Sequence, residues 1–383
     1  MTDKKNWLPL TEDSVRKAHQ IIKPYIHRTP VLTSKTLNRI ASTPQTAEAL
    51  VGTPYEGWTP ASPKINFFFK CENYQRIGAF KIRGAFHAVR RLLDERGEEE
   101  LRKRGVITHS SGNHAQALSL AAKTFNIPAF VIMPSISTPS KIAATKSYGS
   151  TVIFSGSTSE EREAAVEKVQ AENGAILVPP YDHPDIILGQ GTTGLELEEQ
   201  VGELIAGDPS LSVHAGKGDG VSLDAVLTPL GGGGLNSGVA TFFSERRTFV
   251  FGAEPSFQGA DDCRRGLAAG ERIPTVKTLT IGDGLRTPVG EIPWTVISDK
   301  KKVRGVFSVS EEQIKSAMRL VLERMKAFVE PSAVVALAVC LYDEEFRKIV
   351  EKEGGEEGWD IGIVFSGGNT TVEAIAALYG PAN

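Results

Sequence analysis

The sequence predicts an α/β protein with two parallel-sheet domains, and three observations support this class. The chain has 383 residues, which exceeds the size at which a single hydrophobic core usually keeps growing. Apolar runs alternate with amphipathic runs through two separate stretches, as they do in βαβ units. Glycine-bearing loops follow three of the apolar runs, and parallel sheets bind ligands at such loops. We therefore expect two αβα domains with a cleft between them.

The composition narrows the class of partner. Hydrophobic residues make up 40% and charged residues 23% of the chain, and the net charge of -3 leaves no basic excess for nucleic acid. The longest apolar run, residues 333–341, is too short to span a bilayer, and no signal peptide precedes it. Cys71, Cys263 and Cys340 have no metal-type spacing and fit a reducing compartment. We expect a cytoplasmic protein that binds a small molecule, with no nucleic-acid or membrane partner.

The chain before residue 105 predicts two helices around a buried strand. Thr11 is a suitable N-cap with acidic residues behind it, so a helix is expected to about Lys23. The other expected segments are an extended stretch at 28–34, a long surface loop at 40–64, a short buried strand at 67–69, a helix from 81 to about 95 and a charged segment to 104.

Two alternating series of strands and helices follow. The first series is a strand near Val106, a helix from Ala115, a strand at 129–133, a helix near Lys141, a strand at 151–154 and a helix from Glu160. The second series is a helix from Leu195, a strand at 225–227, a helix after Gly234, strands at 249–251 and 361–365, and a helix from Thr370. Loops are expected at 206–222, 274–293 and 353–359.

Lys81 follows the apolar pair Ala79 and Phe80 and begins a predicted helix. An amine held there is partly desolvated, which lowers its pKa and makes it a usable Schiff-base nucleophile at neutral pH. A lysine at a helix start is, taken alone, more often a solvated surface charge. The loops that follow favour the functional interpretation.

Three loops carry groups suited to an anionic ligand. Ser110–His114 lies between a strand and a helix, where backbone N–H groups and hydroxyls can hold a carboxylate. Gly231–Gly234 leaves the backbone free to wrap a phosphate at the start of the next helix. Ser366 follows a predicted strand and points into the crevice of such folds. A serine in either serine loop could be merely an N-cap.

Two other ligands compete for these residues. A dinucleotide-binding turn is one alternative, since Glu254 ends the next strand where a ribose-binding acid would lie, but Asn236 or Ser237 occupies its third glycine position. Glu254, Asp261 and Asp262 offer oxygen ligands for a divalent cation, although a solvated acidic loop is commoner. The histidines form no His-x-x-x-His pair, which argues against zinc. For the Gly231–Gly234 loop, a single phosphate is therefore the better-supported ligand.

In this order the four motifs resemble the pyridoxal-phosphate enzymes of fold type II. The nearest match is the serine/threonine dehydratase and serine racemase group, which includes threo-3-hydroxyaspartate ammonia-lyases, and the resemblance runs from about Arg28 to Asn369. It implies a tryptophan synthase β-like architecture and a homodimer. It also implies a large cofactor-binding domain of residues 1–104 and 183–383 and a small mobile domain of residues 105–182.

The resemblance also implies roles for individual residues. Lys81 would carry pyridoxal 5'-phosphate as a Schiff base. The remaining cofactor contacts would be Phe80, Asn113, Gly231, Gly232, Gly233, Gly234, Leu235 and Ser366. The substrate would contact Ser110, Ser111, Gly112, Asn113 and His114, with Ser111 as the second acid/base that racemisation needs. Glu254, the carbonyl of Ala260 and Asp262 would hold Mg²⁺, Ca²⁺ or Mn²⁺.

The sequence departs from the family pattern at several points. Ala79 stands where serine usually precedes Phe-Lys, and Tyr181 stands where some racemases carry asparagine. Two extra residues between Glu254 and Asp262 put the carbonyl metal ligand in question. No regulatory module follows Ser366, which argues against the feedback-regulated biosynthetic threonine deaminase.

The expected activity is elimination of water from serine, threonine or threo-3-hydroxyaspartate to give a 2-keto acid and ammonia. A serine hydroxyl is a far weaker acid than a pyridinium, so Ser366 would leave the ring nitrogen unprotonated and favour prompt loss of the β-hydroxyl. Arg286 and Arg162 would suit a second substrate carboxylate, although we expect a surface role for both. The alternatives are serine racemase with a side dehydratase activity and, remotely, a nucleotide-binding protein.

Overall fold

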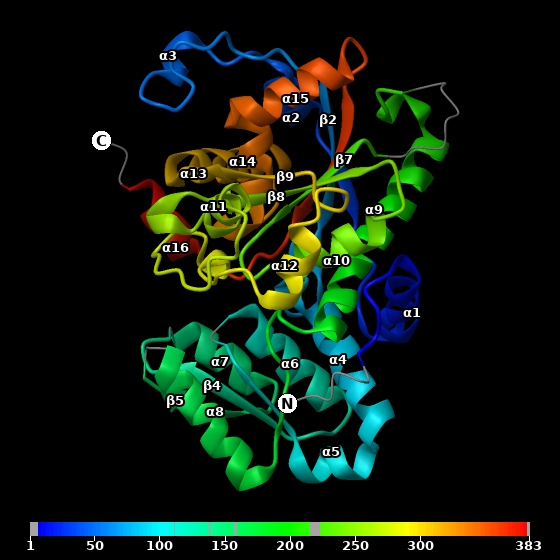
Figure 1. Cartoon of the computed structure of the whole chain (residues 1–383), viewed down its shortest axis with the longest axis vertical. Coiled ribbons are helices and arrows are strands. Elements are labelled where there is room, and N and C mark those ends of the chain that lie inside the picture. Colours follow the sequence, from blue (N-terminus) through cyan, green and yellow to red (C-terminus); the bar gives the residue numbers. More distant parts are fainter. Residues whose placement is uncertain (1–6, 111, 138, 157–158, 215–222, 381–383) are drawn as a thin grey trace.

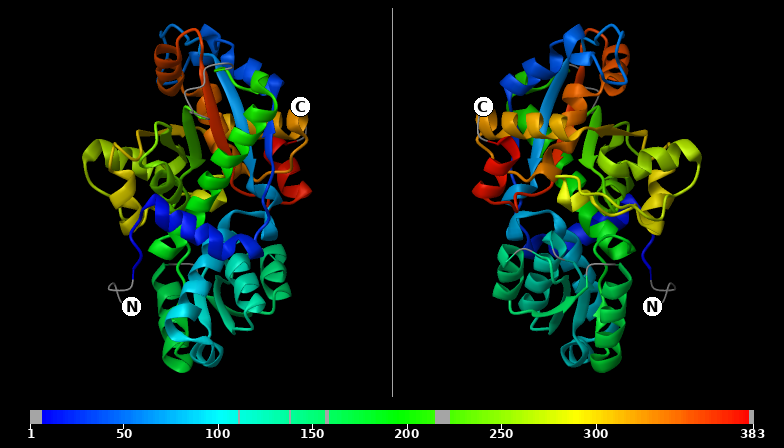
Figure 2. Two further views of the ribbon diagram at one scale, coloured as in Figure 1. Left: turned by 90° about the vertical axis from the view of Figure 1, so that its right-hand side faces the viewer. Right: turned by 90° about the vertical axis from the view of Figure 1, so that its left-hand side faces the viewer.

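The structure is a computed structural model that describes residues 7–110, 112–137, 139–156, 159–214 and 223–380. It has two parts, each built on a sheet, which are stacked along the long axis in Figure 1 and remain distinct in the side views of Figure 2. One sheet has six strands in the order β1-β2-β10-β7-β8-β9, and the other has four in the order β5-β4-β3-β6. All strand pairs are parallel except β1 with β2. The predicted α/β class with two parallel sheets is confirmed.

The six-stranded sheet is buried on both faces. Its strands are β1 (Val31–Thr33), β2 (Ile65–Cys71), β7 (Ala225–Pro229), β8 (Phe249–Pro255), β9 (Gly305–Val309) and β10 (Trp359–Phe365). Phe67 and Phe69 of β2 belong to one hydrophobic cluster, whereas Phe68 between them belongs to the other. Side chains alternate between faces along a strand, so both faces need apolar residues. The strands therefore appear in the sequence as continuous apolar runs.

Helices cover both faces of this sheet. One face carries α2 (Lys35–Ser42), α13 (Glu311–Leu320), α14 (Val335–Tyr342) and α15 (Glu344–Gly354). The other carries α1 (Glu12–Ile22), α9 (Pro184–Gly207), α10 (Gly234–Phe243) and α12 (Glu291–Ile297). The remaining helices of this part are α3 (Ala47–Leu50), α11 (Asp262–Ala269) and α16 (Val372–Tyr379). The core of this part thus has two hydrophobic layers with the sheet between them.

The four-stranded sheet forms the smaller part. Its strands are β3 (Val106–His109), β4 (Ala129–Pro134), β5 (Thr151–Ser155) and β6 (Ile176–Leu177). Its helices are α6 (Asn113–Thr124), α7 (Pro139–Ser147) and α8 (Ser159–Asn173), and α4 (Lys81–Arg96) and α5 (Glu98–Arg104) connect it to the larger part. Residues of α4, α6 and β3 share one hydrophobic cluster. Helix α4 is therefore packed against the smaller part (Figure 1), while Ala79, just before its start, forms a bridge with Gly367 of the larger part.

The helix expected from Leu195 begins at Pro184, so the predicted start was wrong. Glycines at 189, 191 and 194 argue against a helix by propensity, but here they allow close packing. A Cβ on Gly189 would lie 2.6 Å from Cα of Gly84 in α4, and a Cβ on Gly191 would lie 2.5 Å from the carbonyl oxygen of Gly238 in α10. Helix contacts that form only after folding thus override the local preference.

Residues 40–64 are only partly the surface loop that we expected. They contain the end of α2 and the short helix α3, and the rest is irregular. The fully buried guanidinium of Arg347 in α15 donates to the carbonyls of Ala41 at 2.6 Å, Thr43 at 2.9 Å and Ala61 at 3.1 Å. The segment is therefore fixed by a residue almost 300 positions away in the chain.

The sequence left other elements unassigned. The charged segment to Arg104 is α5, and β9, α11, α13, α14 and α15 occupy stretches for which we made no prediction. The expected loop at 274–293 is irregular apart from a 3-10 turn at Asp283–Leu285 and the first residues of α12. The loop expected at 206–222 contains the 3-10 turn Pro209–Leu211, and its residues 215–222 lie outside the described part of the chain. The loop at 353–359 overlaps the ends of α15 and β10.

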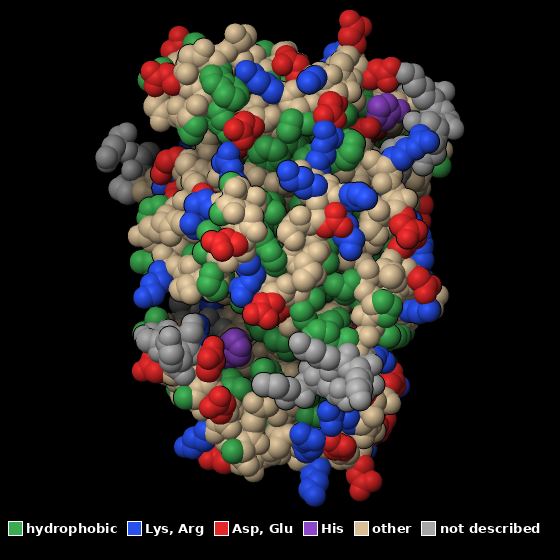
Figure 3. All heavy atoms as spheres, in the orientation of Figure 1, with side chains coloured by type: hydrophobic (Ala, Val, Ile, Leu, Met, Phe, Trp, Pro, Cys, Tyr) green, Lys and Arg blue, Asp and Glu red, His purple; other side chains and the backbone are tan. Residues whose placement is uncertain are grey.

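Within the described residues no helix is long and apolar enough to cross a membrane. On the face drawn in Figure 3, lysine and arginine side chains are interspersed with aspartate and glutamate. That face therefore presents mixed charge over both parts of the molecule.

Candidate active site

Lys81 is the first residue of α4 and lies where the two parts meet. Its Nζ donates a hydrogen bond to the carbonyl oxygen of Pro180 at 2.7 Å and lies 5.2 Å from the centre of the Phe80 ring. Burial lowers the pKa of Lys81 to about 8. Desolvation disfavours the ammonium form, so a useful fraction of the amine is unprotonated near neutral pH. The sequence analysis expected a partly desolvated amine at this position.

Backbone hydrogen bonds hold the Lys81 loop against the end of β10. Ala79 forms an isolated antiparallel bridge with Gly367, and the Phe80 N–H donates to the Ser366 carbonyl at 3.0 Å. β2 and β10 are parallel neighbours, so the loops after both strands emerge at one edge of the sheet. Lys81 and Ser366, both predicted site residues, are thereby brought together. Ser366 is 4% exposed at this edge.

A buried ion network fixes the first turn of α4. The Arg83 guanidinium donates to both carboxylate oxygens of Glu72, at 2.8 Å each, and to Glu196 at 2.7 and 3.1 Å. Lys70 donates to Glu196 at 2.8 Å, and all four side chains are at most 2% exposed. Two cations therefore balance two carboxylates directly behind Lys81. The sequence analysis missed this network, because charged residues in a strand and a helix give no sign of which partners they meet.

The Gly231–Gly234 loop joins β7 to α10 and has the form of an anion site. Gly233 has φ +88°, and a Cβ on Gly231 would lie 2.9 Å from Cα of Leu285. A Cβ on Gly232 would lie 2.3 Å from the ring of Tyr181, so only glycine permits this arrangement. Leu235, in the first turn of α10, is buried in the core. The loop therefore brings the start of α10 to the carboxyl end of β7, where backbone N–H groups would suit a phosphate.

The Ser110–His114 loop leads from β3 into α6 in the smaller part. Ser110 Oγ accepts from the Gly112 N–H at 3.3 Å, and Asn113 is the first residue of α6. His114 is 2% exposed and its Nε2 lies 3.1 Å from the Val178 carbonyl, so its side chain is engaged in the core. Burial, with the charge of Lys81 as the next cause, lowers the pKa of His114 to about 3. Ser111 lies outside the described residues.

Glu330 is a site residue that the sequence analysis overlooked. Its Oε1 accepts from Asn113 Nδ2 at 2.9 Å and its Oε2 from the Asn369 N–H at 3.1 Å. Asn369 Nδ2 in turn donates to Asn113 Oδ1 at 2.7 Å. Burial, and next the charge of Asp283, raise the pKa of Glu330 to about 7. These three side chains join the two parts beside Lys81. In the sequence, the only signal of this role is that an acidic residue stands just before Pro331.

The three predicted metal ligands come together around α11. Glu254 ends β8, and its carboxylate accepts from the N–H groups of Cys263 at 3.0 Å and Arg264 at 2.9 Å. Asp262 accepts from the Val289 N–H at 3.1 Å, and Ala260 is buried beside it. Burial, followed by the charge of Asp262, raises the pKa of Glu254 well above its usual range, and burial raises that of Asp262 to about 6. Two adjacent buried acids are a suitable donor set for a hard cation.

The two arginines suggested as carboxylate partners behave differently. Arg286 is exposed and donates to the carbonyl of Thr280 at 2.9 and 2.7 Å, so its guanidinium holds its own loop. Arg162 lies close enough to His109 to lower the pKa of that imidazole, after the larger effect of burial. The expected surface role fits Arg286.

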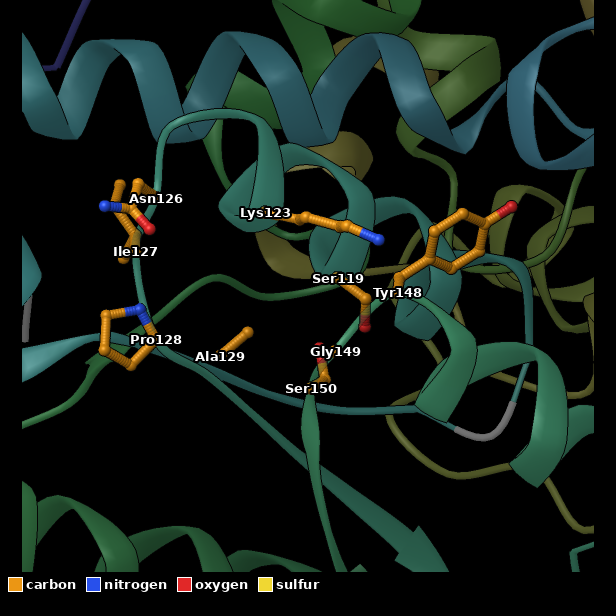
Figure 4. Close-up of a pocket in the computed structure, with 9 residues that line it drawn as sticks. All are labelled: Ser119, Lys123, Asn126, Ile127, Pro128, Ala129, Tyr148, Gly149 and Ser150. Atoms are coloured by element: carbon orange, nitrogen blue, oxygen red, sulfur yellow. The ribbon is translucent and has the colours of Figure 1, made fainter.

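A separate cavity of about 320 Å³ opens in the smaller part (Figure 4). Ser119, Lys123, Tyr148 and Ser150 contribute to its lining. Ala129, also in the lining, begins β4, whereas the Ser110 loop follows the end of the parallel strand β3. The cavity therefore lies at the opposite edge of the four-stranded sheet from the predicted substrate loop.

A model of the pyridoxal-phosphate dependent enzyme family matches residues 48–367. The chain belongs to this family. A serine racemase of Arabidopsis thaliana is 39% identical over 364 residues, 94% of each chain. An L-threo-3-hydroxyaspartate ammonia-lyase of Saccharomyces cerevisiae is 37% identical over 372 residues, 96% of each. The solved structure of maize serine racemase matches with a TM-score of 0.77 and 37% identity, covering 95% of both chains.

Membership of this pyridoxal-phosphate enzyme family agrees with the geometry. The resemblance to fold type II enzymes and the expected cofactor are thereby confirmed. The residues present fit the cofactor: Lys81 has a lowered pKa, and the glycines from 231 to 234 lead into α10 without side chains. The helix start behind them suits a phosphate. The nucleotide-binding alternative leaves Lys81 and Ser366 without a role.

Proposed function

We propose that this enzyme removes water from a β-hydroxy amino acid, namely serine, threonine or threo-3-hydroxyaspartate. The products are a 2-keto acid and ammonia, because the enamine left after elimination hydrolyses. The observation that carries this proposal is that Lys81, with its pKa lowered to about 8, shares one sheet edge with Ser366. Relatives named ammonia-lyase and serine racemase support this class of reaction.

The cofactor would be held mainly by the larger part. Gly231–Gly234 and Leu235 would bind the phosphate through N–H groups at the start of α10, and Phe80 would lie beside the ring. Asn113 would donate to the phenolic oxygen, and Ser366 would hydrogen-bond the ring nitrogen without protonating it. When bound, pyridoxal phosphate supplies the electron-withdrawing π system that acidifies the Cα–H bond of an attached amino acid.

Lys81 would act twice. Its unprotonated amine would hold the cofactor, and the same amine, when free, would take the α-proton of the substrate. The N–H groups at the start of α6, in the Ser110–His114 loop, would hold the substrate carboxylate so that the Cα–H bond points toward Lys81 Nζ. Glu330 would orient Asn113 through its 2.9 Å hydrogen bond. The β-hydroxyl would leave as water, taking its proton from the cofactor phosphate or from a nearby water.

Serine racemase is the second candidate, and its support is the high identity to serine racemases over nearly the whole chain. Racemisation needs an acid on the opposite face of the carbanion from Lys81. We assign that role to Ser111, by resemblance alone. Ser111→Ala should then abolish racemisation and spare elimination from L-serine, whereas equal loss of both would assign Ser111 to substrate binding.

We further propose that Glu254, the Ala260 carbonyl and Asp262 bind Mg²⁺, Ca²⁺ or Mn²⁺. The support is the pair of adjacent buried acids with raised pKa values, whose mutual repulsion a cation would relieve. Substitution Glu254→Gln should abolish any effect of magnesium on stability. An unchanged magnesium response would contradict this site.

The remaining proposals concern the whole molecule. Residues 105–182 would move as a small domain against residues 1–104 and 183–383, and the support is that they are built on a four-stranded sheet of their own. A cytoplasmic homodimer is proposed as well, with the free, buried state of Cys71, Cys263 and Cys340 in favour of a reducing compartment. Light scattering of the purified protein tests the dimer.

The deciding experiment follows keto acid and product chirality together. Purified enzyme is incubated with L-serine, L-threonine and both threo-3-hydroxyaspartates, with and without magnesium. Keto acid without D-amino acid establishes the lyase and its substrate. D-serine formed faster than pyruvate assigns the racemase instead. Absence of both products, with Lys81→Ala as the blank, overturns the proposal.

A further inference from the structure

Three side chains of metal-binding type meet at the amino-terminal edge of the six-stranded sheet. His214 follows the 3-10 turn Pro209–Leu211, Asp224 precedes β7, and Asp360 is the second residue of β10. One imidazole nitrogen and one oxygen of each carboxylate all lie within 4.8 Å of one another. Lys81 and Gly231–Gly234 lie at the opposite, carboxyl edge. This cluster is therefore distinct from the active site and from the Glu254 acids.

Burial distinguishes the cluster from an ordinary acidic surface. Asp360 is fully buried, and the side chains of His214 and Asp224 are only 18% and 19% exposed. Exposed acids are well solvated and need no cation, whereas adjacent buried carboxylates repel each other at low dielectric. Two carboxylates and a neutral imidazole carry a charge that one divalent cation balances.

Outer contacts already orient each of the three groups. His214 Nε2 lies 2.8 Å from Asp224 Oδ2, and the same oxygen accepts from the Asp360 N–H at 2.7 Å. On the other side of the ring, His214 Nδ1 lies 3.7 Å from Glu357 Oε2, which is beyond hydrogen-bond distance. Asp360 accepts from Ser212 Oγ at 2.5 Å and from Asn66 Nδ2 at 2.6 Å, which sets the plane of its carboxylate.

We propose that His214, Asp224 and Asp360 bind a divalent first-row transition-metal ion, Zn²⁺ or Mn²⁺. One nitrogen and two carboxylate ligands favour such an ion over Mg²⁺ or Ca²⁺, which prefer oxygen alone. A tetrahedral zinc site places ligand atoms about 3.4 Å apart, so rotation of these side chains suffices. The metal would join the segment after α9, which contains His214, to the start of β7 and of β10. It would thereby stabilise that edge of the sheet.

The test titrates zinc chloride into the holoenzyme after removal of metals with EDTA. One zinc ion per chain should bind, and at least tenfold more weakly to His214→Ala. The matched control is His27→Ala, which removes an exposed histidine and should bind zinc as the wild type does. Glu254→Gln should also leave this zinc ion in place. Zinc binding of wild-type strength in His214→Ala, or no stoichiometric zinc in the wild type, would overturn the proposal.

X-ray absorption of the zinc-loaded protein identifies the ligands independently. One nitrogen and several oxygens in the coordination shell are expected, and sulfur or oxygen alone would contradict the site. If His214→Ala does not fold, Asp224→Asn serves as the second variant with the same expected loss. The melting temperature should rise with zinc in the wild type and in Glu254→Gln, but not in either ligand variant; equal shifts in all four proteins would refute the assignment.

Discussion

The two sheets of this enzyme use the same βαβ units but differ in depth of burial. Strands β7 and β10 are buried along their whole length, whereas every residue of β5 is exposed or only partly buried. In the larger part aromatic rings pack on one another, for example Phe69 stacked on Phe365. In the smaller sheet Val106, Ala129 and Ile176 belong to the cluster shared with α4 and α6, whereas the clusters around Ile107 and Val131 contain only a few residues.

This difference separates two kinds of functional group. The lysine and the tetraglycine loop are attached to the deeply buried sheet, and the Ser110–His114 loop is attached to the shallower one. Regions with little buried apolar area open at low free-energy cost, and active-site closure uses such regions. The comparison therefore predicts a rigid cofactor side and an adaptable substrate side.

Lys81→Ala removes the lysine of the cofactor side and should have the largest effect on turnover. Removal of the amine that we propose attaches the cofactor and takes the α-proton is expected to lower turnover by at least about 10⁴-fold. The absorbance of the lysine-bound cofactor should disappear, while circular dichroism stays that of the wild type. Lys123→Ala, in the smaller part, is the matched control and should keep full turnover. Undiminished keto-acid production by Lys81→Ala would contradict the proposed mechanism.

The same comparison explains what could be predicted from the sequence. Lys81, Gly231–Gly234 and Ser366 each follow a buried apolar strand, so local pattern and the geometry of parallel sheets suffice to place them at one edge. Glu330 and Arg83 could not be assigned roles in this way. Their partners are defined only when segments far apart in the chain meet, as with Glu330 and Asn113, which are 217 positions apart.

Element boundaries failed for a related physical reason. The start of α9 was placed too late because glycine is a poor helix former, but at Gly189 and Gly191 small size is needed for contact with α4 and α10. The segment 40–64 has no periodicity, and its structure depends on carbonyl bonds from the buried Arg347. Tertiary packing thus decided both cases.

Arg83→Met tests whether the rigid side depends on its buried ion network. The change leaves Glu72 and Glu196 without their shared guanidinium, and breaking a buried pair in this way costs about 3–5 kcal/mol. We expect the midpoint of chemical unfolding to fall accordingly, together with cofactor affinity. Arg102→Met on the exposed face of α5 should change stability by less than about 0.5 kcal/mol. Equal effects of the two substitutions would show that the network is not what stabilises the rigid side.

Glu330→Gln tests the junction between the two sides by its effect on how the stability of the fold depends on pH. Burial raises the pKa of Glu330 from its usual value near 4.5 to about 7. Between these values the folded protein holds a proton that the unfolded chain has lost, so this residue makes the fold less stable as pH rises through that window. The full loss is about 3 kcal/mol. It is absent below pH 4.5 and complete above pH 7.

The variant has no such proton, so its stability relative to the wild type should increase by about 3 kcal/mol between pH 4.5 and pH 8. Chemical unfolding at several pH values measures the difference, and any constant effect of the lost Asn113 or Asn369 hydrogen bond cancels. Glu312→Gln, at an exposed acid, should show no pH-dependent difference. Parallel pH curves for wild type and Glu330→Gln would mean that Glu330 is ionised in the fold at pH 5.

Lys141→Ala tests the contact of the adaptable substrate side with the larger part, and we expect it to have the smallest effect of these substitutions. Lys141 of α7 and Asp283 of the larger part form an ion pair at 2.6 Å whose side chains are 30% and 38% exposed. Pairs this exposed contribute at most about 1 kcal/mol and are screened by salt. Because the pair spans the two parts, its loss should raise KM by about two- to fivefold and leave thermal stability unchanged. Added salt should raise the KM of the wild type toward that of the variant, while Lys168→Ala on α8 keeps wild-type values. A KM that falls in Lys141→Ala would instead mean that the pair holds the substrate side apart from the cofactor side.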